Sequence, residues 1–338
     1  MALQPIGENY DVVQFDRPDK SSLNTGEKWL QPIQSPKDNQ QWSKSPQGAG
    51  GGSTVLYDPV QNQIATASRN GTVVAVDAVT GAENWSHTHH NNDSIENLTY
   101  DPEFNRIVSV SGNKSLPEGE YLSVDAETGE LHTTDIFNHW NLIYDSAFDS
   151  TQKRIVTGDD DGVVVSAKAG NLSKEWEHSL HGNAEVHNII YDPAQNQILS
   201  GDINGTVICV DATDGSQQWS KNLLNNLTYG LAYNPLNNNV VAAAGKIVSV
   251  SAIDGSEQWS VPLSGGAYAA THNLEHNQII TGSPSGTVNG FDATNGAKKW
   301  SHSFHTEPVY SVSVDSAQNN VVSIDGNGDV ISASLQIK

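Results

Sequence analysis

The sequence predicts an all-β protein: a seven-bladed β-propeller of four-stranded antiparallel blades, with the last blade closed by an N-terminal strand. Three observations lead to this prediction. A segment recurs seven times with a period of roughly 40 to 47 residues, the spacing of propeller blades. Each copy holds four short apolar runs separated by turn residues. The strand that the last copy lacks is found near the N-terminus.

The repeat is clearest in two blocks. Residues 57–86 read YDPVQNQIATASRNGTVVAVDAVTGAENWS, and residues 191–220 read YDPAQNQILSGDINGTVICVDATDGSQQWS. Weaker copies start at Tyr100, Tyr144, Tyr233, His272 and Val314. Together these give seven starts, one for each predicted blade.

The first copy shows why each run should be a strand. Its apolar or alternating runs cover residues 54–57, 64–68, 72–77 and 84–87. Pro59 ends the first run, because proline cannot donate to a sheet ladder. Gly71 supplies the positive φ of a tight hairpin between the second and third runs, and Gly205 and Gly286 do the same in other copies.

A tryptophan follows the glycine of the third-to-fourth hairpin in most copies. Trp85, Trp219, Trp259 and Trp300 stand four residues after that glycine, and Trp176 follows Gly170 with two extra residues. In the second copy Thr133 stands at this position. We expect these rings to fill the space between the outer parts of neighbouring blades rather than to form ligand cages.

The two ends of the chain are predicted to meet in one blade. The last copy ends after its third run, residues 330–335, whereas QQWSK at 40–44 repeats QQWSK at 217–221. We therefore assign residues 37–338 to the propeller, with 37–46 supplying the outer strand of the last blade. Residues 1–36 carry four prolines and no periodic pattern, and we interpret them as an extended arm anchored through Trp29.

Charge and composition exclude several classes of function. The formal charge of −22 disfavours a nucleic-acid backbone or an anionic membrane as partner. The single cysteine, Cys209, excludes an internal disulfide and lies in an apolar run, which indicates the core. We find neither a secretion signal nor a membrane-spanning segment. The shortage of lysine and arginine is typical of halophiles, so we expect a virion or the cytoplasm of a halophilic host; an acidic mesophilic protein is the alternative.

The repeat resembles a known superfamily. Ala75, Asp77, Thr80, Gly81 and Trp85 are similar to the tryptophan-docking repeat of the pyrroloquinoline-quinone-like propellers, and the whole unit also resembles a distant WD-repeat. The quinoprotein dehydrogenases of this superfamily hold their cofactor under a vicinal disulfide, which one cysteine cannot form. The resemblance therefore implies no bound cofactor and favours the non-enzymatic members, which act as scaffolds and assembly factors.

Histidines gather in the segments that join one blade to the next. Nine of the twelve lie there: His87, His89, His90, His139, His178, His181, His187, His302 and His305. These connections share one face of a propeller with hairpins such as the one that carries Asp160. We select as a candidate ligand or partner face the residues His89, His90, His139, Trp140, His181, His187, His305 and Asp160.

Two interpretations of that face stay open. Imidazoles and carboxylates that converge at one mouth of the channel would suit zinc, nickel or manganese. Histidines at this position can instead bond to the backbone of the blades, which is the interpretation we prefer, and we assign no metal site. Trp140 could stack on a sugar or anchor a partner. We find no nucleophile elbow or phosphate loop and assign no catalytic residue.

The sequence thus favours a non-enzymatic protein-interaction or structural propeller that is docked through its N-terminal arm into a larger assembly. A tail, baseplate or capsid-surface component of a haloarchaeal virus is the specific hypothesis. The alternatives are a cytoplasmic scaffold of a halophile, and a carbohydrate- or metal-binding propeller, either lectin or enzyme, that uses the histidine-rich face.

Overall fold

The computed structural model describes residues 40–47, 51–90, 93–112, 119–133 and 141–335. Every described residue belongs to one compact unit, which comprises residues 35–338. Trp29, His139 and Trp140 lie outside the described residues. All regular structure in the described ranges is strand, and no helix there could cross a membrane.

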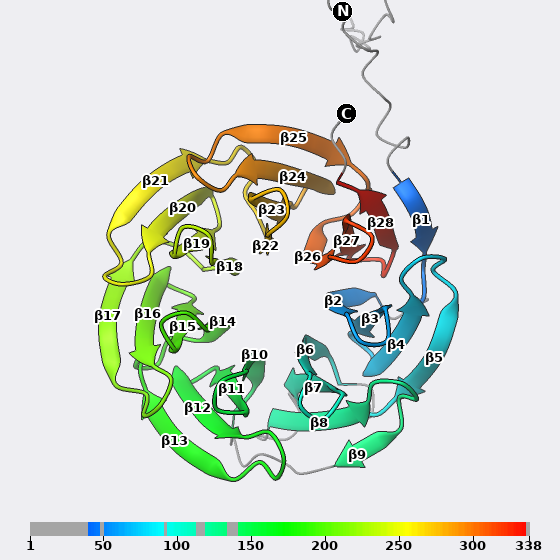
Figure 1. Cartoon of the computed structure of the whole chain (residues 1–338), viewed down its shortest axis with the longest axis horizontal. Helices are drawn as coiled ribbons and strands as arrows, with labels where there is room; N and C mark the ends of the chain where they lie inside the picture. Colours follow the sequence, from blue (N-terminus) through cyan, green and yellow to red (C-terminus); the bar gives the residue numbers. More distant parts are fainter. Residues whose placement is uncertain (1–39, 48–50, 91–92, 113–118, 134–140, 336–338) are drawn as a thin grey trace, which may run out of the picture. The chain divides into compact units, whose positions relative to one another are not determined.

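The strands form seven four-stranded antiparallel sheets arranged around a ring, which confirms the predicted fold (Figure 1). From the channel outward, the first three blades are β2 (Gly52–Asp58), β3 (Gln63–Ser68), β4 (Thr72–Asp77), β5 (Glu83–Thr88); β6 (Ile95–Asp101), β7 (Arg106–Gly112), β8 (Gly119–Asp125), β9 (Leu131–Thr133); and β10 (Ile143–Asp149), β11 (Arg154–Asp159), β12 (Val163–Lys168), β13 (Lys174–Ser179).

The next three blades follow the same order. They are β14 (Val186–Asp192), β15 (Gln197–Asp202), β16 (Thr206–Asp211), β17 (Gln217–Asn222); β18 (Gly230–Asn234), β19 (Asn239–Ala243), β20 (Lys246–Ser251), β21 (Glu257–Pro262); and β22 (Ala269–Asn273), β23 (Gln278–Gly282), β24 (Thr287–Asp292), β25 (Lys298–Ser303). The last blade is built from β26 (Val309–Asp315), β27 (Asn320–Asp325), β28 (Val330–Ser334) and β1 (Gln40–Lys44).

The last blade is closed as the sequence predicts. β1 pairs antiparallel with β28 and places Trp42 opposite Ser332. In the copy that it repeats, Trp219 stands opposite Cys209 in the same way. The N-terminal strand therefore takes the place of a fourth strand in the last blade, and β28 has no free edge.

The tryptophans occupy one structural position and bind the next blade. The indole Nε1 of Trp42 donates to the carbonyl of Ala78 at 2.9 Å, and Trp85 donates to Ala126 at 3.1 Å. Trp176, Trp219 and Trp259 make the equivalent bonds to Ala212, Ala252 and Ala293. The predicted packing role is therefore confirmed at these five seams. Thr133 pairs with Ser123 at the equivalent place in the second blade.

One of the seven predicted repeat starts is wrong. The copy assigned to Tyr144 begins four residues later, because β10 aligns Phe148 and Asp149 with Tyr57 and Asp58 of β2. Tyr144-Asp145 imitates the Tyr-Asp start, while the true turn lacks the usual proline after Asp149. Tyr144 consequently lies at the beginning of its strand, near the channel mouth.

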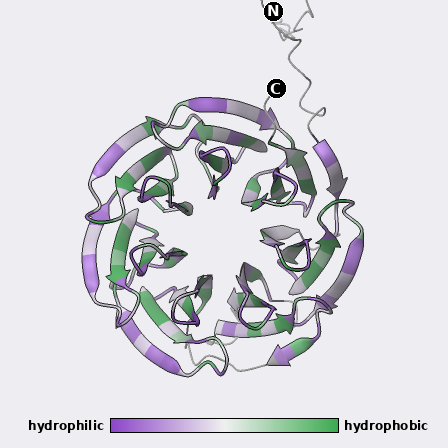
Figure 2. Ribbon diagram, in the orientation of Figure 1, coloured by the Kyte–Doolittle hydropathy of each residue, from purple (hydrophilic) through white to green (hydrophobic). Residues whose placement is uncertain are grey.

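The core lies between the blades. The third strands are buried along most of their length, as in β4, whereas β5 buries mainly Trp85. Figure 2 shows this division, with green segments along the third strands and purple ones along the outermost strands. Cys209 is fully buried in the core, as expected, and burial raises the pKa of its thiol to about 12.

Candidate functional site

The innermost strands of all seven blades enclose a cavity of about 540 Å³ at the centre of the ring. This volume lies within the range of small-ligand sites, which is roughly 300 to 1,000 Å³. Every blade contributes residues from the start of its innermost strand. The cavity therefore opens on the face that carries the connections between blades.

One position of the repeat supplies one side chain from each blade to the lining. It lies four residues before the aligned residue of Tyr57, and in chain order it holds Ser53, Glu96, Tyr144, His187, Tyr229, Tyr268 and Tyr310. In five blades this residue falls between two register partners, at a β-bulge. A bulge re-aims the side chain of the extra residue, which explains why these side chains reach the opening.

The edges of the innermost strands are closed by their neighbours. These strands have only one partner in their own blade, so their second edge would leave backbone groups unpaired. Ser311 Oγ accepts from Val55 N at 3.2 Å across the seam between the last and first blades. Asp145 Oδ2 accepts from Ile189 N at 2.6 Å in the same way. Such bonds hold the ring of strands in a fixed geometry below the mouth.

Three tyrosines from consecutive blades form one side of the mouth. The ring centroids of Tyr229 and Tyr268 are 4.8 Å apart, and those of Tyr268 and Tyr310 are 5.7 Å apart with nearly parallel planes. The Arg69 guanidinium lies 4.8 Å above the Tyr310 ring. Tyr229 is exposed and the other two are partly exposed. This aromatic side is therefore open to a ligand.

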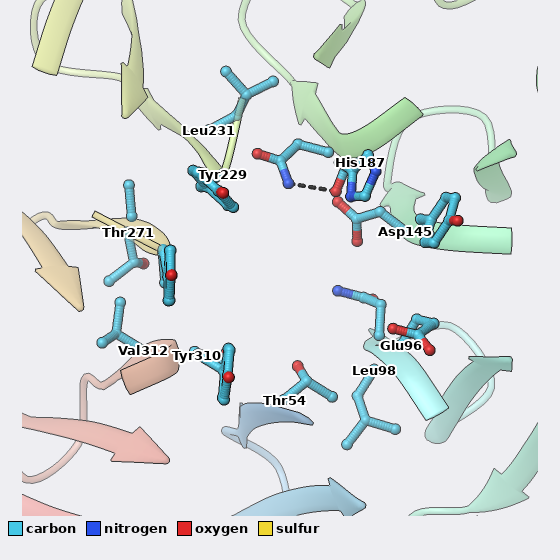
Figure 3. A pocket seen from close by; sticks show the side chains of 18 of the residues that line it. Thr54, Glu96, Leu98, Asp145, His187, Tyr229, Leu231, Thr271, Tyr310 and Val312 are labelled. Carbon is cyan, nitrogen blue, oxygen red and sulfur yellow. Dashed lines mark hydrogen bonds between the residues drawn. The ribbon is translucent and has the colours of Figure 1, made fainter. Parts of the chain in front are cut away.

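Carboxylates face the tyrosines. Figure 3 shows Tyr229 and Tyr310 on one side of the opening, and Glu96, Asp145 and His187 across from them. His187 stacks on Tyr144 with centroids 4.4 Å apart, and its Nε2 lies 2.8 Å from Glu185 Oε2. We call Glu96, Tyr144, Asp160, Glu185 and His187 the acidic side.

Burial and the carboxylates of the acidic side raise the pKa of the Tyr144 hydroxyl. Burial, followed by the negative charges of Glu185, Asp160 and Glu96, raises the pKa of Tyr144 to about 12. Three carboxylates thus stand close enough to this phenol to disfavour its ionised form. Burial, together with the charges of Asp159 and Asp161, also raises the pKa of Asp160.

Asp145 is a buried carboxyl directly after Tyr144. Its two oxygens accept the backbone N–H groups of Ser146 and Ile189. Desolvation nevertheless dominates and raises the pKa of Asp145 from 3.8 to about 7. Asp145 therefore joins two blades and carries a proton more readily than an ordinary aspartate.

Three of the selected histidines join neighbouring blades, because each follows the outermost strand of one blade and its side chain bonds to the next blade. His90 Nε2 lies 2.7 Å from Ser109 Oγ, His181 Nε2 lies 2.7 Å from Ser200 Oγ, and His305 Nε2 lies 2.8 Å from Ser323 Oγ. Their Nδ1 atoms lie 2.9 to 3.2 Å from Glu120, Asp202 and Asp325. Each backbone N–H also reaches a hairpin glycine, which places connections and hairpins on one face as predicted.

The other selected residues are divided between the seam and the mouth. His89 bonds to the Gly129 carbonyl of the next blade at 3.1 Å. His187 and Asp160 come together around Tyr144. Among the described residues, no group of three or more histidine, cysteine or acidic side chains could hold a metal ion.

The tyrosines at the mouth were not predicted from the sequence as functional residues. A signal for them exists, because four of the seven residues at one repeat position are tyrosine. Recognising it requires the correct start of the third blade, which the misaligned Tyr144 hid.

Comparisons with known proteins agree with this architecture. No curated protein matches the sequence. Among solved structures, the crystal structure of the computationally designed Ika8 protein is similar, with a TM-score of 0.65 and 18% identity over 88% of this chain and 100% of that chain. That likeness shows the fold alone. A family model described as outer membrane protein assembly factor BamB (PQQ_2) matches residues 26–201 and 203–336. The chain therefore belongs to this family of pyrroloquinoline-quinone-like propellers.

Proposed function

We propose that the chain is a non-enzymatic interaction module that holds a protein partner over the mouth of its channel. The matching family model is described as an assembly factor, and this supports a role in bringing proteins together. The exposed aromatic rings of the mouth support the same role, since tyrosines are enriched at the centres of protein interfaces.

The observation that carries the proposal is the variation at the mouth. At the seams the repeat is more uniform, because five of the seven carry the same indole-to-alanine bond. At the mouth the equivalent position changes from serine to glutamate, tyrosine and histidine around the ring. Fold stability does not require this variation, whereas recognition of an asymmetric partner does.

Co-purification from the native source tests the proposal. Tyr268→Ser removes the central ring of the aromatic side. Val79→Ser is a matched control, because Val79 is 53% exposed and lies in the hairpin between β4 and β5, away from the mouth. We expect wild type and Val79→Ser to retain the same partner and Tyr268→Ser to lose it. Retention by Tyr268→Ser would refute the proposal, and loss by Val79→Ser alone would move the interface to the opposite face.

A finer version of this role comes from the sequence alone. In this version the arm, residues 1–36 with Trp29, docks the propeller into a larger assembly, such as a haloarchaeal virion or a scaffold in its host. Deletion of residues 2–36 should leave the propeller folded, as measured by circular dichroism, and should release it from the assembly. Co-sedimentation of the truncated chain with the assembly would contradict this version.

A further inference from the structure

The mouth of the channel has two chemically different sides, and together they define what can bind there. One side presents the rings of Tyr229, Tyr268 and Tyr310. The other presents Glu96 and the carboxylates around Tyr144. None of the described residues that line the cavity is lysine or arginine. Among the described lining residues, the acidic side therefore has no cationic partner.

The aromatic side already shows which group it accepts. Arg69 comes from the hairpin between β3 and β4 of the first blade, and the carbon of its guanidinium lies 4.8 Å from the ring centroid of Tyr310 in the last blade. The attraction between a cation and the face of an aromatic ring is strongest where water is partly excluded. Tyr268 and Tyr229 continue the same wall, and within the described residues no cation is recorded over either ring.

We infer that the mouth binds an arginine side chain of the protein partner, stacked on the tyrosines and paired with Glu96 and its neighbouring carboxylates. This inference deepens the proposed function and rests on it. A guanidinium fits better than an ammonium because it is planar, stacks on rings and donates in a fork to carboxylates. The cavity of about 540 Å³ leaves room for the residues that flank the arginine. The net charge of −22 attracts a basic segment from a distance.

Binding of short peptides to the full chain tests this inference. The probes are acetyl-Gly-Arg-Gly-amide and the same peptide with citrulline, which keeps the shape of arginine and removes its charge. We expect the arginine peptide to bind with a Kd in the millimolar range and the citrulline peptide to bind at least about 5-fold more weakly. Added salt should weaken the binding of the arginine peptide only.

Substitutions at the mouth test whether the arginine peptide binds there. Tyr268→Ser should weaken the arginine peptide by about 3- to 30-fold, the range of one cation–π contact. Glu96→Gln should weaken it by a similar factor, whereas Glu83→Gln on the outer strand β5 serves as a matched control and should leave binding unchanged. Equal binding of the citrulline peptide, or an unchanged Kd in Glu96→Gln, would overturn the inference. So would binding of a neutral sugar such as maltotriose in place of the arginine peptide.

The two proposals fail in different ways. If the arginine peptide does not bind but Tyr268→Ser still releases the partner, the arginine inference is wrong and the proposed function stands. If Tyr268→Ser retains the partner, the proposed function is wrong whatever the peptides do. Loss of partner and loss of peptide in the same variant would support both.

Discussion

The outer seams and the inner mouth of the propeller are made from the same repeat, but the residue at the equivalent position varies far more at the mouth than at the seams. At the seams, Trp42, Trp85 and their equivalents place an indole against the next blade and bond to an alanine carbonyl. At the mouth, the equivalent residues are as different as Ser53 and Tyr310. Repetition thus marks positions that the fold needs, and departure from it marks positions that are free for recognition.

Two of the seven seams depart from the rule. The second blade has Thr133 in place of the tryptophan, and Trp300 departs for a local reason. Trp300 donates to Gln278 of its own blade at 2.8 Å instead of to the next blade. It pairs with Gly290, where a Cβ would lie 2.2 Å from the indole, so the ring lies across its own strand. The other described tryptophans face residues that have a Cβ, such as Cys209, and their rings turn toward the neighbouring blade.

The largest expected effect concerns closure of the ring. Trp42→Ala should lower the free energy of unfolding by about 3–5 kcal/mol, because a buried indole and its bond to Ala78 are lost where the two chain ends pair. Trp300→Ala is the matched control: that ring is only partly buried and bonds within its blade, so its loss should be smaller. Urea unfolding followed by circular dichroism measures both, and equal losses would contradict the special role of β1.

Much of this outer architecture could be predicted from sequence. The identical QQWSK segments at 40–44 and 217–221 were sufficient to pair β1 with β28. Strand bounds in the first blade were predicted to within two residues, because Pro59 and Gly71 end or turn the chain by their own geometry. Such signals depend on a few neighbouring residues, and they recur from one copy of the repeat to the next.

The mouth could be predicted only in part. His187 and Asp160 were selected from the sequence, but their partner Tyr144 had been taken for a repeat start. The bulges that turn these side chains inward depend on how the innermost strand pairs with the second strand. No single residue type in the sequence predicts that pairing. The mouth also joins residues from seven blades, and which of them face one another is decided by closure of the ring.

Consecutive residues can belong to different regions: Tyr144 lies at the mouth, whereas Asp145 bonds across the seam between two blades. Its pKa is about 7 in the folded chain, against 3.8 as the ordinary value. As the pH rises from about 4 through 7, the folded state holds a proton that the unfolded state has already lost, so the wild type loses stability. Asp145→Asn cannot ionise, although its amide can accept only one of the two backbone bonds.

We therefore expect the stability of Asp145→Asn relative to wild type to improve as the pH rises from 4 to 8, by on the order of 2–4 kcal/mol. Unfolding in urea at several pH values measures this change. Glu257→Gln on the outer strand β21 is the control and should leave the pH profile of the wild type unchanged. A pH-independent difference between Asp145→Asn and wild type would show that the carboxyl stays ionised in the folded chain.

The smallest effect on stability is expected at the mouth itself. Ser53 occupies the bulge of the first blade and is the one residue of the ring position without a large side chain. Ser53→Tyr adds a fourth ring to the aromatic side, next to Tyr310. Three consecutive blades already have tyrosine at this position. Because the bulge is retained, the free energy of unfolding should change by less than about 0.5 kcal/mol.

The same variant should change binding, because the new ring narrows the opening on the side of the first blade. We expect Ser53→Tyr to alter retention of the partner in co-purification while its urea midpoint stays that of the wild type. A loss of stability as large as that of Trp42→Ala would place the mouth among the positions that the fold needs. The contrast between uniform seams and a variable mouth would then no longer distinguish structure from recognition.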